Sequence, residues 1–245
     1  MRIAVISDIH GNLRALEAVL ADIRTRRVDA IVNLGDCVAG PLWPRETHVL
    51  LTSLGLPTVR GNHDRWLVDR SLQDLPPADR FAHAALGARE RSALHALPAT
   101  LELDGDILAV HGTPTDDSQY LTEERSGVRL VPASRGILAE RLGPASKRQV
   151  VLCGHSHRQS VTQFPGGCLI VNPGTVGCPL FADLAEANQL ELRSPHARYA
   201  VLTRRNGRWG AELLALEYDW NEAAACAGAN GFPRWAQALA TGAVA

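Results

Sequence analysis

The pattern of apolar and polar positions predicts that strands and helices alternate at the start of the chain. A β-branched apolar run from Arg2 to Ser7 is typical of a buried strand. Apolar residues then recur at helical spacing, which predicts an amphipathic helix over residues 12–27. The alternation continues with strands expected at 30–34 and 57–60 and a helix at 44–54. This order favours parallel strands joined by helical crossovers.

The middle and the end of the chain mix helices with hairpins. Residues 64–97 look helical and are interrupted at Pro76-Pro77. Asp104-Gly105 predicts a hairpin between 101–103 and 107–110, and the polar segment 113–132 predicts a loop. Further along we expect a helix at 134–142, strands at 149–153, 159–164 and 168–171, a hairpin of 199–203 with 209–216, and a broken helical tail at 219–242.

Composition narrows the class of protein. The chain has 245 residues, 25 Lys+Arg and 26 Asp+Glu, and a formal net charge of -1. This balance lacks the basic excess of nucleic-acid and membrane-surface proteins, so we expect no stable nucleic-acid complex. We also expect no membrane span, because no apolar run approaches roughly 18 residues. A strand at the N-terminus leaves no room for a signal peptide, and the five cysteines are not grouped as CxxC; both features predict a cytoplasmic protein with reduced thiols.

Polar residues with metal-binding side chains follow several of the expected strands. The carboxyl ends of strands in an α/β sheet lie at one edge, where ligands bind, so these residues are expected to meet there. In extended backbone, residues i and i+2 point the same way, which would pair Asp8 with His10 and His155 with His157. Carboxylate and imidazole ligands suit manganese, iron, zinc, nickel or cobalt better than calcium. The five segments are Asp8-Ile9-His10, Gly35-Asp36, Gly61-Asn62-His63-Asp64, His111-Gly112 and Gly154-His155-Ser156-His157.

These five segments, in this order, resemble the signature of the calcineurin-like metallophosphoesterases. The resemblance runs from residue 7 to about residue 175, and all five blocks are intact. The forms Ser7–Asn12 and Asn172–Gly177 are similar to the compact bacterial and archaeal branch. The resemblance implies an α/β fold, a four-layer α/β/β/α sandwich of two mixed β-sheets flanked by helices. We expect one domain over 1–245, with 178–245 as an appendage that either covers the site or contacts another subunit.

The resemblance also implies a two-metal site with a separate acid. Asp36 would bridge the two cations, with manganese favoured, and a bridging hydroxide would attack phosphorus. Metals about 3.5–4 Å apart activate such a water and leave a positive centre that attracts phosphate. His63 would protonate the leaving group, an effect worth roughly 10²–10⁴-fold, and Asp64 would orient His63. Asp8, His10 and His157 would bind one metal, and Asn62, His111 and His155 the other.

Three further residues have both a functional and a structural interpretation. Arg60 and Arg198 either contact substrate phosphate or are solvated or structural. Asn12 either caps the first long helix or contacts the site. Sequence alone leaves these alternatives open.

The expected function is hydrolysis of phosphate mono- or diesters, with small nucleotide-like substrates preferred. Hydrolysis of dinucleoside polyphosphates or of phosphoproteins is the alternative. A non-catalytic metal-binding scaffold is disfavoured, because every expected ligand and His63 are retained. A lactone- or amide-cleaving metallohydrolase is disfavoured because the HxHxDH pattern is absent. Self-association into a homo-oligomer is left open.

Overall fold

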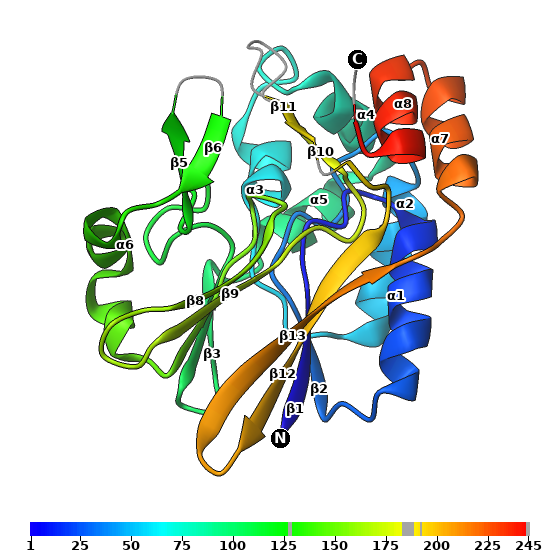
Figure 1. Cartoon of the computed structure of the whole chain (residues 1–245). Coiled ribbons are helices and arrows are strands. Elements are labelled where there is room, and N and C mark those ends of the chain that lie inside the picture. Colours follow the sequence, from blue (N-terminus) through cyan, green and yellow to red (C-terminus); the bar gives the residue numbers. More distant parts are fainter. Residues whose placement is uncertain (127–128, 183–188, 192, 244–245) are drawn as a thin grey trace.

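Two mixed β-sheets form the centre of the computed structural model, which describes residues 1–126, 129–182, 189–191 and 193–243. The first sheet has the order β13-β12-β1-β2 (Figure 1). β1 pairs in parallel with β2 and antiparallel with β12, which in turn pairs antiparallel with β13. The strands are β1 (Arg2–Ile6), β2 (Ala30–Asn33), β12 (Ala197–Arg205) and β13 (Arg208–Leu216).

The second sheet has the order β3-β4-β7-β9-β8. Its centre is parallel, since β7 pairs in parallel with both β4 and β9, and its two edge strands are antiparallel to their neighbours. The strands are β3 (Thr100–Leu103), β4 (Ile107–Val110), β7 (Val150–Leu152), β8 (Gln159–Gln163) and β9 (Leu169–Pro173).

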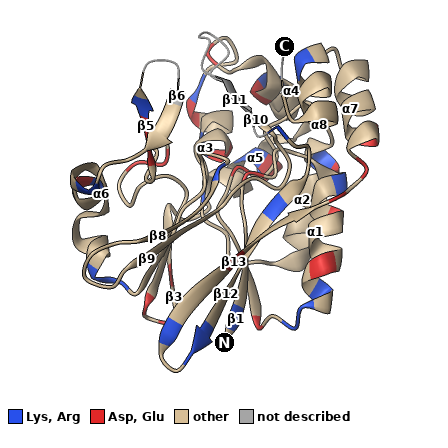
Figure 2. Cartoon of the chain, viewed as in Figure 1, with Lys and Arg blue, Asp and Glu red and all other residues tan. Residues whose placement is uncertain are grey.

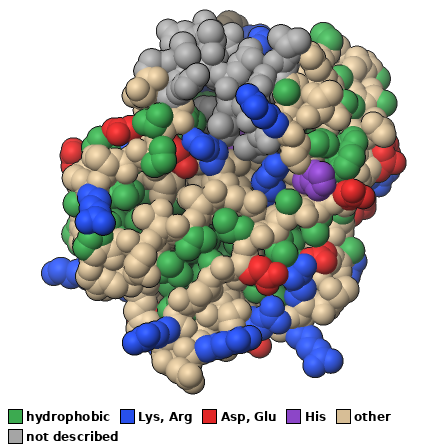
Figure 3. Space-filling model, in the orientation of Figure 1, with side chains coloured by type: hydrophobic (Ala, Val, Ile, Leu, Met, Phe, Trp, Pro, Cys, Tyr) green, Lys and Arg blue, Asp and Glu red, His purple; other side chains and the backbone are tan. Residues whose placement is uncertain are grey.

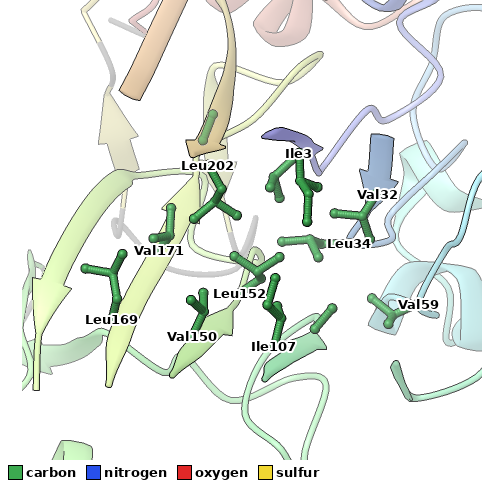
Figure 4. Close-up of a cluster of buried hydrophobic side chains, with 13 residues drawn as sticks. Ile3, Val32, Leu34, Val59, Ile107, Val150, Leu152, Leu169, Val171 and Leu202 are labelled. Carbon is green, nitrogen blue, oxygen red and sulfur yellow. The ribbon is translucent and has the colours of Figure 1, made fainter. Parts of the chain in front are cut away.

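The main hydrophobic core lies between the two sheets. Successive side chains of a strand point to opposite faces, so Ile3 and Val5 of β1 face inward while Ala4 and Ile6 face a helix. The inward set packs against β4, β7 and β9, and the labelled members of this core approach one another in Figure 4. It comprises Ile3, Val5, Val32, Leu34, Val59, Ile107, Ala109, Val150, Leu152, Leu169, Val171, Ala200 and Leu202.

Helices cover the outer face of each sheet. α1 (Leu13–Thr25) buries Leu16, Val19 and Ile23 against β1 and β12, and α2 (Pro44–Leu54) packs beside it. α6 (Arg135–Leu142) and the 3-10 turn η1 (Gly143–Lys147) cover the second sheet (Figure 1). The predicted four-layer α/β/β/α sandwich is therefore confirmed.

The remaining helices surround the end of the sandwich that carries the candidate site. α3 (Asn62–Asp69), α4 (Pro77–Ala85) and α5 (Ala88–His95) share one apolar cluster, and α7 (Trp220–Ala229) and α8 (Pro233–Thr241) share another. None of the described helices combines the length and apolar character that a membrane crossing requires. Acidic and basic residues are interspersed along the ribbon (Figure 2), and basic side chains are scattered over the face shown in Figure 3.

Two predicted elements were wrong in detail. Residues 57–60 contribute a single bridge, Thr58 to Asn33, because the following turn into α3 begins at once. The predicted loop 113–132 contains a hairpin of β5 (Glu123–Ser126) and β6 (Arg129–Pro132). The short pair β10 (Leu180–Ala182) and β11 (Gln189–Glu191) was not predicted.

The C-terminal segment does more than extend the core motifs. β12 lies between β1 and β13 and pairs with β1 from Arg2↔Thr203 to Val5↔Ala200. This part of 178–245 is thus built into the first sheet rather than appended to it. Residues 183–188, 192 and 244–245 of the predicted appendage lie outside the described residues.

Candidate active site

The loops that follow four strands and the start of α3 bring the candidate residues together. Asp8 and His10 follow β1, Asp36 follows β2, His111 follows β4, and His155 and His157 follow β7. Two groups of side chains have ligand atoms within 4.8 Å of one another. They are Asp8, His10 and His157, and Asp36, His111 and His155.

Left-handed backbone conformations aim these side chains at one another. The two members of each expected pair, and Asp36 after Gly35, all have positive φ. This conformation costs about 1–3 kcal/mol in a non-glycine residue. The extended backbone expected for the two pairs is therefore wrong, although the pairs do converge. The φ angles are 55° for Asp8, 50° for His10, 54° for Asp36, 64° for His155 and 59° for His157.

Backbone carbonyls fix the protonation of three histidines. Nδ1 of His10 lies 2.7 Å from the Ala39 carbonyl, and Nδ1 of His111 lies 2.7 Å from the Leu34 carbonyl. Nδ1 of His157 lies 3.0 Å from the Cys178 carbonyl. A carbonyl only accepts, so each Nδ1 carries a proton, and a ring of this set that is neutral presents its lone pair on Nε2.

Those lone pairs face each other across the site. Nε2 of His10 lies 3.1 Å from Nε2 of His157, and Oδ1 of Asp8 is 3.3 Å from the latter. Two neutral imidazoles with lone pairs this close repel unless a proton or a metal cation lies between them. Imidazole nitrogens backed by carbonyls, next to buried carboxylates, form the donor set of a transition-metal site.

Asp36 lies between the two groups. Its Oδ2 is 3.8 Å from Nε2 of His10 and 3.3 Å from Nε2 of His111. Its Oδ1 accepts the backbone N–H of His63 at 3.0 Å, at the N-terminus of α3. Burial raises the pKa of Asp36, but the imidazoles of His111 and His63 outweigh burial and hold it well below its usual range. Asp36 is thus a buried, ionised carboxylate of the second group that also lies close to His10 of the first.

Asn62 completes the second group. Its Oδ1 lies 3.0 Å from Nε2 of His111, and its side chain is fully buried at the first position of α3. On the other side of this group, His155 donates Nε2–H to the Ser118 carbonyl at 3.0 Å, which leaves the lone pair on its Nδ1. The structure therefore brings all seven expected ligands into two adjoining clusters.

Asp79, not Asp64, contacts the imidazole of His63. Nδ1 of His63 is 2.8 Å from Oδ2 of Asp79, which lies in the first turn of α4 and is only 1% exposed. Burial lowers the pKa of His63, but the carboxylates of Asp79 and Asp36 outweigh it and raise the pKa to about 9 in the metal-free protein. With Nδ1 held by Asp79, Nε2 remains to meet a substrate.

Asp64 holds the loop instead. Its carboxylate accepts the backbone N–H groups of Asp36 at 2.9 Å, Cys37 at 3.0 Å and Gly61 at 3.0 Å. The expectation that Asp64 orients His63 is corrected accordingly, since its oxygens are used by these backbone groups. Burial and the nearby Asp36 raise the pKa of Asp64 to about 6. Gly61 is required here because a Cβ would overlap Oδ1 of Asp36.

A cavity of about 880 Å³ opens onto this centre. Its floor includes His10, Asn62, His63, His155 and His157. Its walls are largely apolar and aromatic with several charged side chains, as in many small-molecule sites. They include Trp66, Arg70, Leu75, Pro76, Pro77, Ala78, Tyr120, Arg125, Arg141, Arg234 and Trp235.

Residues 1–194 match the model of the calcineurin-like phosphoesterase superfamily domain. The chain belongs to this superfamily. The resemblance drawn from the five sequence blocks is thereby confirmed, and the protein is a phosphoric ester hydrolase of a family that depends on divalent metals.

Solved structures agree with this assignment. A metallophosphoesterase from Sphaerobacter thermophilus is 29% identical with a TM-score of 0.73, over 99% of this chain and 100% of that chain. Protein PH1004 from Pyrococcus horikoshii, described as hypothetical, shares the fold with a TM-score of 0.78 at 18% identity, over 100% of this chain and 99% of that chain.

A curated relative matches over a shorter stretch. Uncharacterized protein MJ0912 of Methanocaldococcus jannaschii is 46% identical over 72 residues. These residues are 29% of this chain and 30% of that protein, so the match spans less than a third of the relative's length.

The three residues that were expected to contact substrate form hydrogen bonds within the protein instead. Asn12 caps α1 through Ala15 N–H and donates to the Gly177 carbonyl. The guanidinium of Arg60 donates to the His95 carbonyl, and that of Arg198 donates to the carbonyls of Ser194 and His196. None of the three is among the described residues that line the cavity. Their structural interpretations fit these contacts.

Sequence reasoning missed the residues that line the cavity of the phosphoesterase beyond the ligands. Asp79 follows the Pro76-Pro77 break, and no spacing rule connects it with His63. Trp66 lies one helical turn after Asn62 on α3, which a helical projection of the third block could have indicated. Trp235 lies in the Ala-rich tail, two residues after Pro233. The only sign of its role in the sequence is that it is a large aromatic residue in this segment.

Proposed function

We propose that the protein is a dinuclear-metal phosphoesterase acting on mono- or diesters of small, nucleotide-like molecules. Asp8, His10 and His157 would hold one cation, and Asn62, His111 and His155 would hold the other. Asp36 would be a ligand of both. The observation that carries this proposal is the place of Asp36 Oδ2, 3.8 Å from His10 Nε2 and 3.3 Å from His111 Nε2.

Manganese is the favoured metal, since nitrogen and oxygen donors without thiolate suit it and its neighbours in the series. When bound, the two cations supply Lewis acidity and lower the pKa of a water that can attack phosphorus. The buried carboxylates of Asp8 and Asp36 offset part of the cationic charge. The net positive charge that remains favours an anionic phosphate.

His63 donates the proton that the leaving oxygen needs. Its side chain lines the cavity, its Nδ1 is bound by Asp79, and its ring lies 5.4 Å from that of His10, so Nε2 is the nitrogen left for proton transfer. Asp79 holds the ring in place and favours its protonated form, while Asp64 fixes the loop that presents Asp36. Cation binding and proton transfer are thus assigned to different residues, since His63 is not among the expected metal ligands.

The test is hydrolysis of bis(p-nitrophenyl) phosphate and p-nitrophenyl phosphate with added Mn²⁺. We expect turnover that a chelator abolishes and Mn²⁺ restores. His63→Ala should lose about 10²–10⁴-fold with a poor alkyl leaving group and much less with p-nitrophenolate, which needs no acid. His83→Ala, which removes an imidazole outside the cavity lining, is the control.

Two results would contradict the proposal. Metal-loaded protein without turnover on any phosphate ester would leave a metal-binding scaffold as the function. Wild-type turnover of a poor leaving group by His63→Ala would remove the proton-donor role of His63.

A further inference from the structure

Two tryptophans flank the two histidines at the mouth of the site. The ring centroid of Trp66 lies 4.6 Å from that of His63, and His63 lies 5.4 Å from His10. His10 in turn lies 6.3 Å from Trp235. The aromatic rings therefore run Trp66, His63, His10, Trp235, with the proton donor between the metal-binding His10 and an indole.

The wall beside these rings is apolar. Leu75 and Pro76 precede α4, Pro77 and Ala78 begin it, and this stretch lines the same cavity as both indoles. Pro76 and Pro77 make this segment rigid, because proline fixes φ. An indole beside such a wall favours a flat ring over a flexible chain or a hydrated sugar.

One arginine lies against an indole, and a second lines the same cavity. The guanidinium carbon of Arg70 lies 3.5 Å from the ring centroid of Trp66, and Arg234 precedes Trp235 in α8. Both side chains line the cavity. Arginine next to an aromatic ring is a combination that binds nucleobases and their phosphates.

The second indole lies outside the residues that match the superfamily domain. The superfamily domain matches residues 1–194, whereas Trp235 lies on α8 at Pro233–Thr241. α8 packs on α7 through Ala223, Ala227 and Leu239, which positions it beside the site. The second indole thus comes from a part of the chain beyond the matched domain, whereas all seven expected ligands lie within that domain.

We propose that Trp66 and Trp235 form the leaving-group site and select a planar aromatic leaving group, a nucleoside, over an alkyl or sugar alcohol. The proposal rests on the proposed function, because His63 protonates the leaving oxygen and the leaving group must therefore lie on the side of His63. That side carries the two indoles and the rigid apolar wall. The oxygen of water bonds to phosphorus as the bond between phosphorus and the leaving oxygen breaks, and the leaving oxygen takes a proton from His63. The proton that the attacking water loses restores His63 over the cycle, and phosphate or a phosphomonoester remains.

The test compares AMP with ribose 5-phosphate in the presence of Mn²⁺, and the methyl ester of AMP with the methyl ester of ribose 5-phosphate. Each pair has the same phosphoryl group and the same leaving 5′-oxygen and differs only by the base. We expect the wild-type kcat/KM to be at least about 10-fold higher with the base present, because stacking of one base on aromatic side chains has this magnitude. Release of adenosine from AMP or its methyl ester is the product assay.

The variants Trp66→Leu and Trp235→Leu separate selection from structure. We expect the ratio of kcat/KM between the members of a pair to fall by about 10-fold in these variants. Trp220→Leu removes an indole that contacts His196 and Tyr218 outside the cavity lining, and its ratio should equal that of wild type. Thermal melting checks that each variant is folded.

The ratio of kcat/KM with and without the base distinguishes the outcomes. A ratio that falls in Trp66→Leu or Trp235→Leu, and not in Trp220→Leu, supports the leaving-group site. A wild-type ratio near one, an equal loss on both members of a pair, or turnover of p-nitrophenyl esters without release of adenosine overturns it while the proposed function stands. Absence of Mn²⁺-dependent turnover of bis(p-nitrophenyl) phosphate overturns both.

Discussion

Nδ1 of His63 lies 2.8 Å from the carboxylate of Asp79, sixteen residues further along the chain and in a different helix. Asp79 is buried, so this contact is shielded from solvent and holds the imidazole in one orientation. Despite burial, which lowers the pKa of His63, Asp79 and Asp36 raise it to about 9 without metal. Without metal, the imidazole of His63 therefore stays protonated above neutral pH.

Replacing Asp79 should weaken the donor without emptying the metal site. In Asp79→Asn the pKa of His63 falls toward the ordinary value of about 6.5, so the protonated fraction is lost at lower pH. The descending limb of the kcat profile against pH should therefore move to lower pH. Bound cations lower this pKa in both proteins, so the comparison isolates the carboxylate. Unchanged metal content with an unchanged pH profile would show that Asp79 does not act through His63.

Asp64 should matter for stability. Its carboxylate accepts three backbone N–H groups, and Asp64→Ala leaves them buried without that acceptor. We expect a loss of about 3 kcal/mol in the free energy of unfolding, measured by urea denaturation, since each buried group left unsatisfied costs about 1–3 kcal/mol. Asp69→Ala removes an exposed carboxylate from the same helix and should cost less than about 1 kcal/mol. Equal losses in the two variants would be inconsistent with the assigned role of Asp64.

The metal site was more predictable than its surroundings because its residues follow the ends of strands. Apolar runs located β1, β2, β4 and β7, and the ligand residue types stood directly after them. The backbone that brings Asp8 and His10 together was not predictable, since left-handed φ in a non-glycine residue depends on tertiary contacts. In the same way, the fully buried Asp64 offered no sign that its partners are backbone groups.

The remaining features were hard to predict because they depend on contacts between residues far apart in the sequence. The apolar pattern identified β12 and β13 as a hairpin, but pairing of β12 with β1 joins residues about two hundred positions apart, which no local pattern records. The hairpin β5–β6 was missed because Glu123–Ser126 is polar and lacks alternation. Trp235 reaches the cavity only because α8 packs on α7, and helix packing of this kind is not encoded in the spacing of an Ala-rich segment.

Bound metal should stabilise the folded protein as well as activate the enzyme. The ligands come from loops after β1, β2, β4 and β7 and from α3, so bound cations tie both sheets together. Mn²⁺ at about 100 times its dissociation constant should add roughly 2.7 kcal/mol and raise Tm, measured by differential scanning calorimetry. Mg²⁺, which prefers oxygen ligands, should raise Tm less. A Tm that is indifferent to Mn²⁺ would contradict the proposed ligand sets.

The bridging role of Asp36 is the central claim, and the number of bound metals tests it most directly. Asp36 and Asp104 both have left-handed backbones, with φ of 54° and 51°, which asparagine also tolerates, so Asp36→Asn and Asp104→Asn form a matched pair. Elemental analysis after loading with Mn²⁺ should find two ions per chain in wild type and in Asp104→Asn. Asp36→Asn should hold fewer than two and lose Mn²⁺-dependent phosphoesterase activity. Two tightly bound ions and full activity in Asp36→Asn would contradict the account.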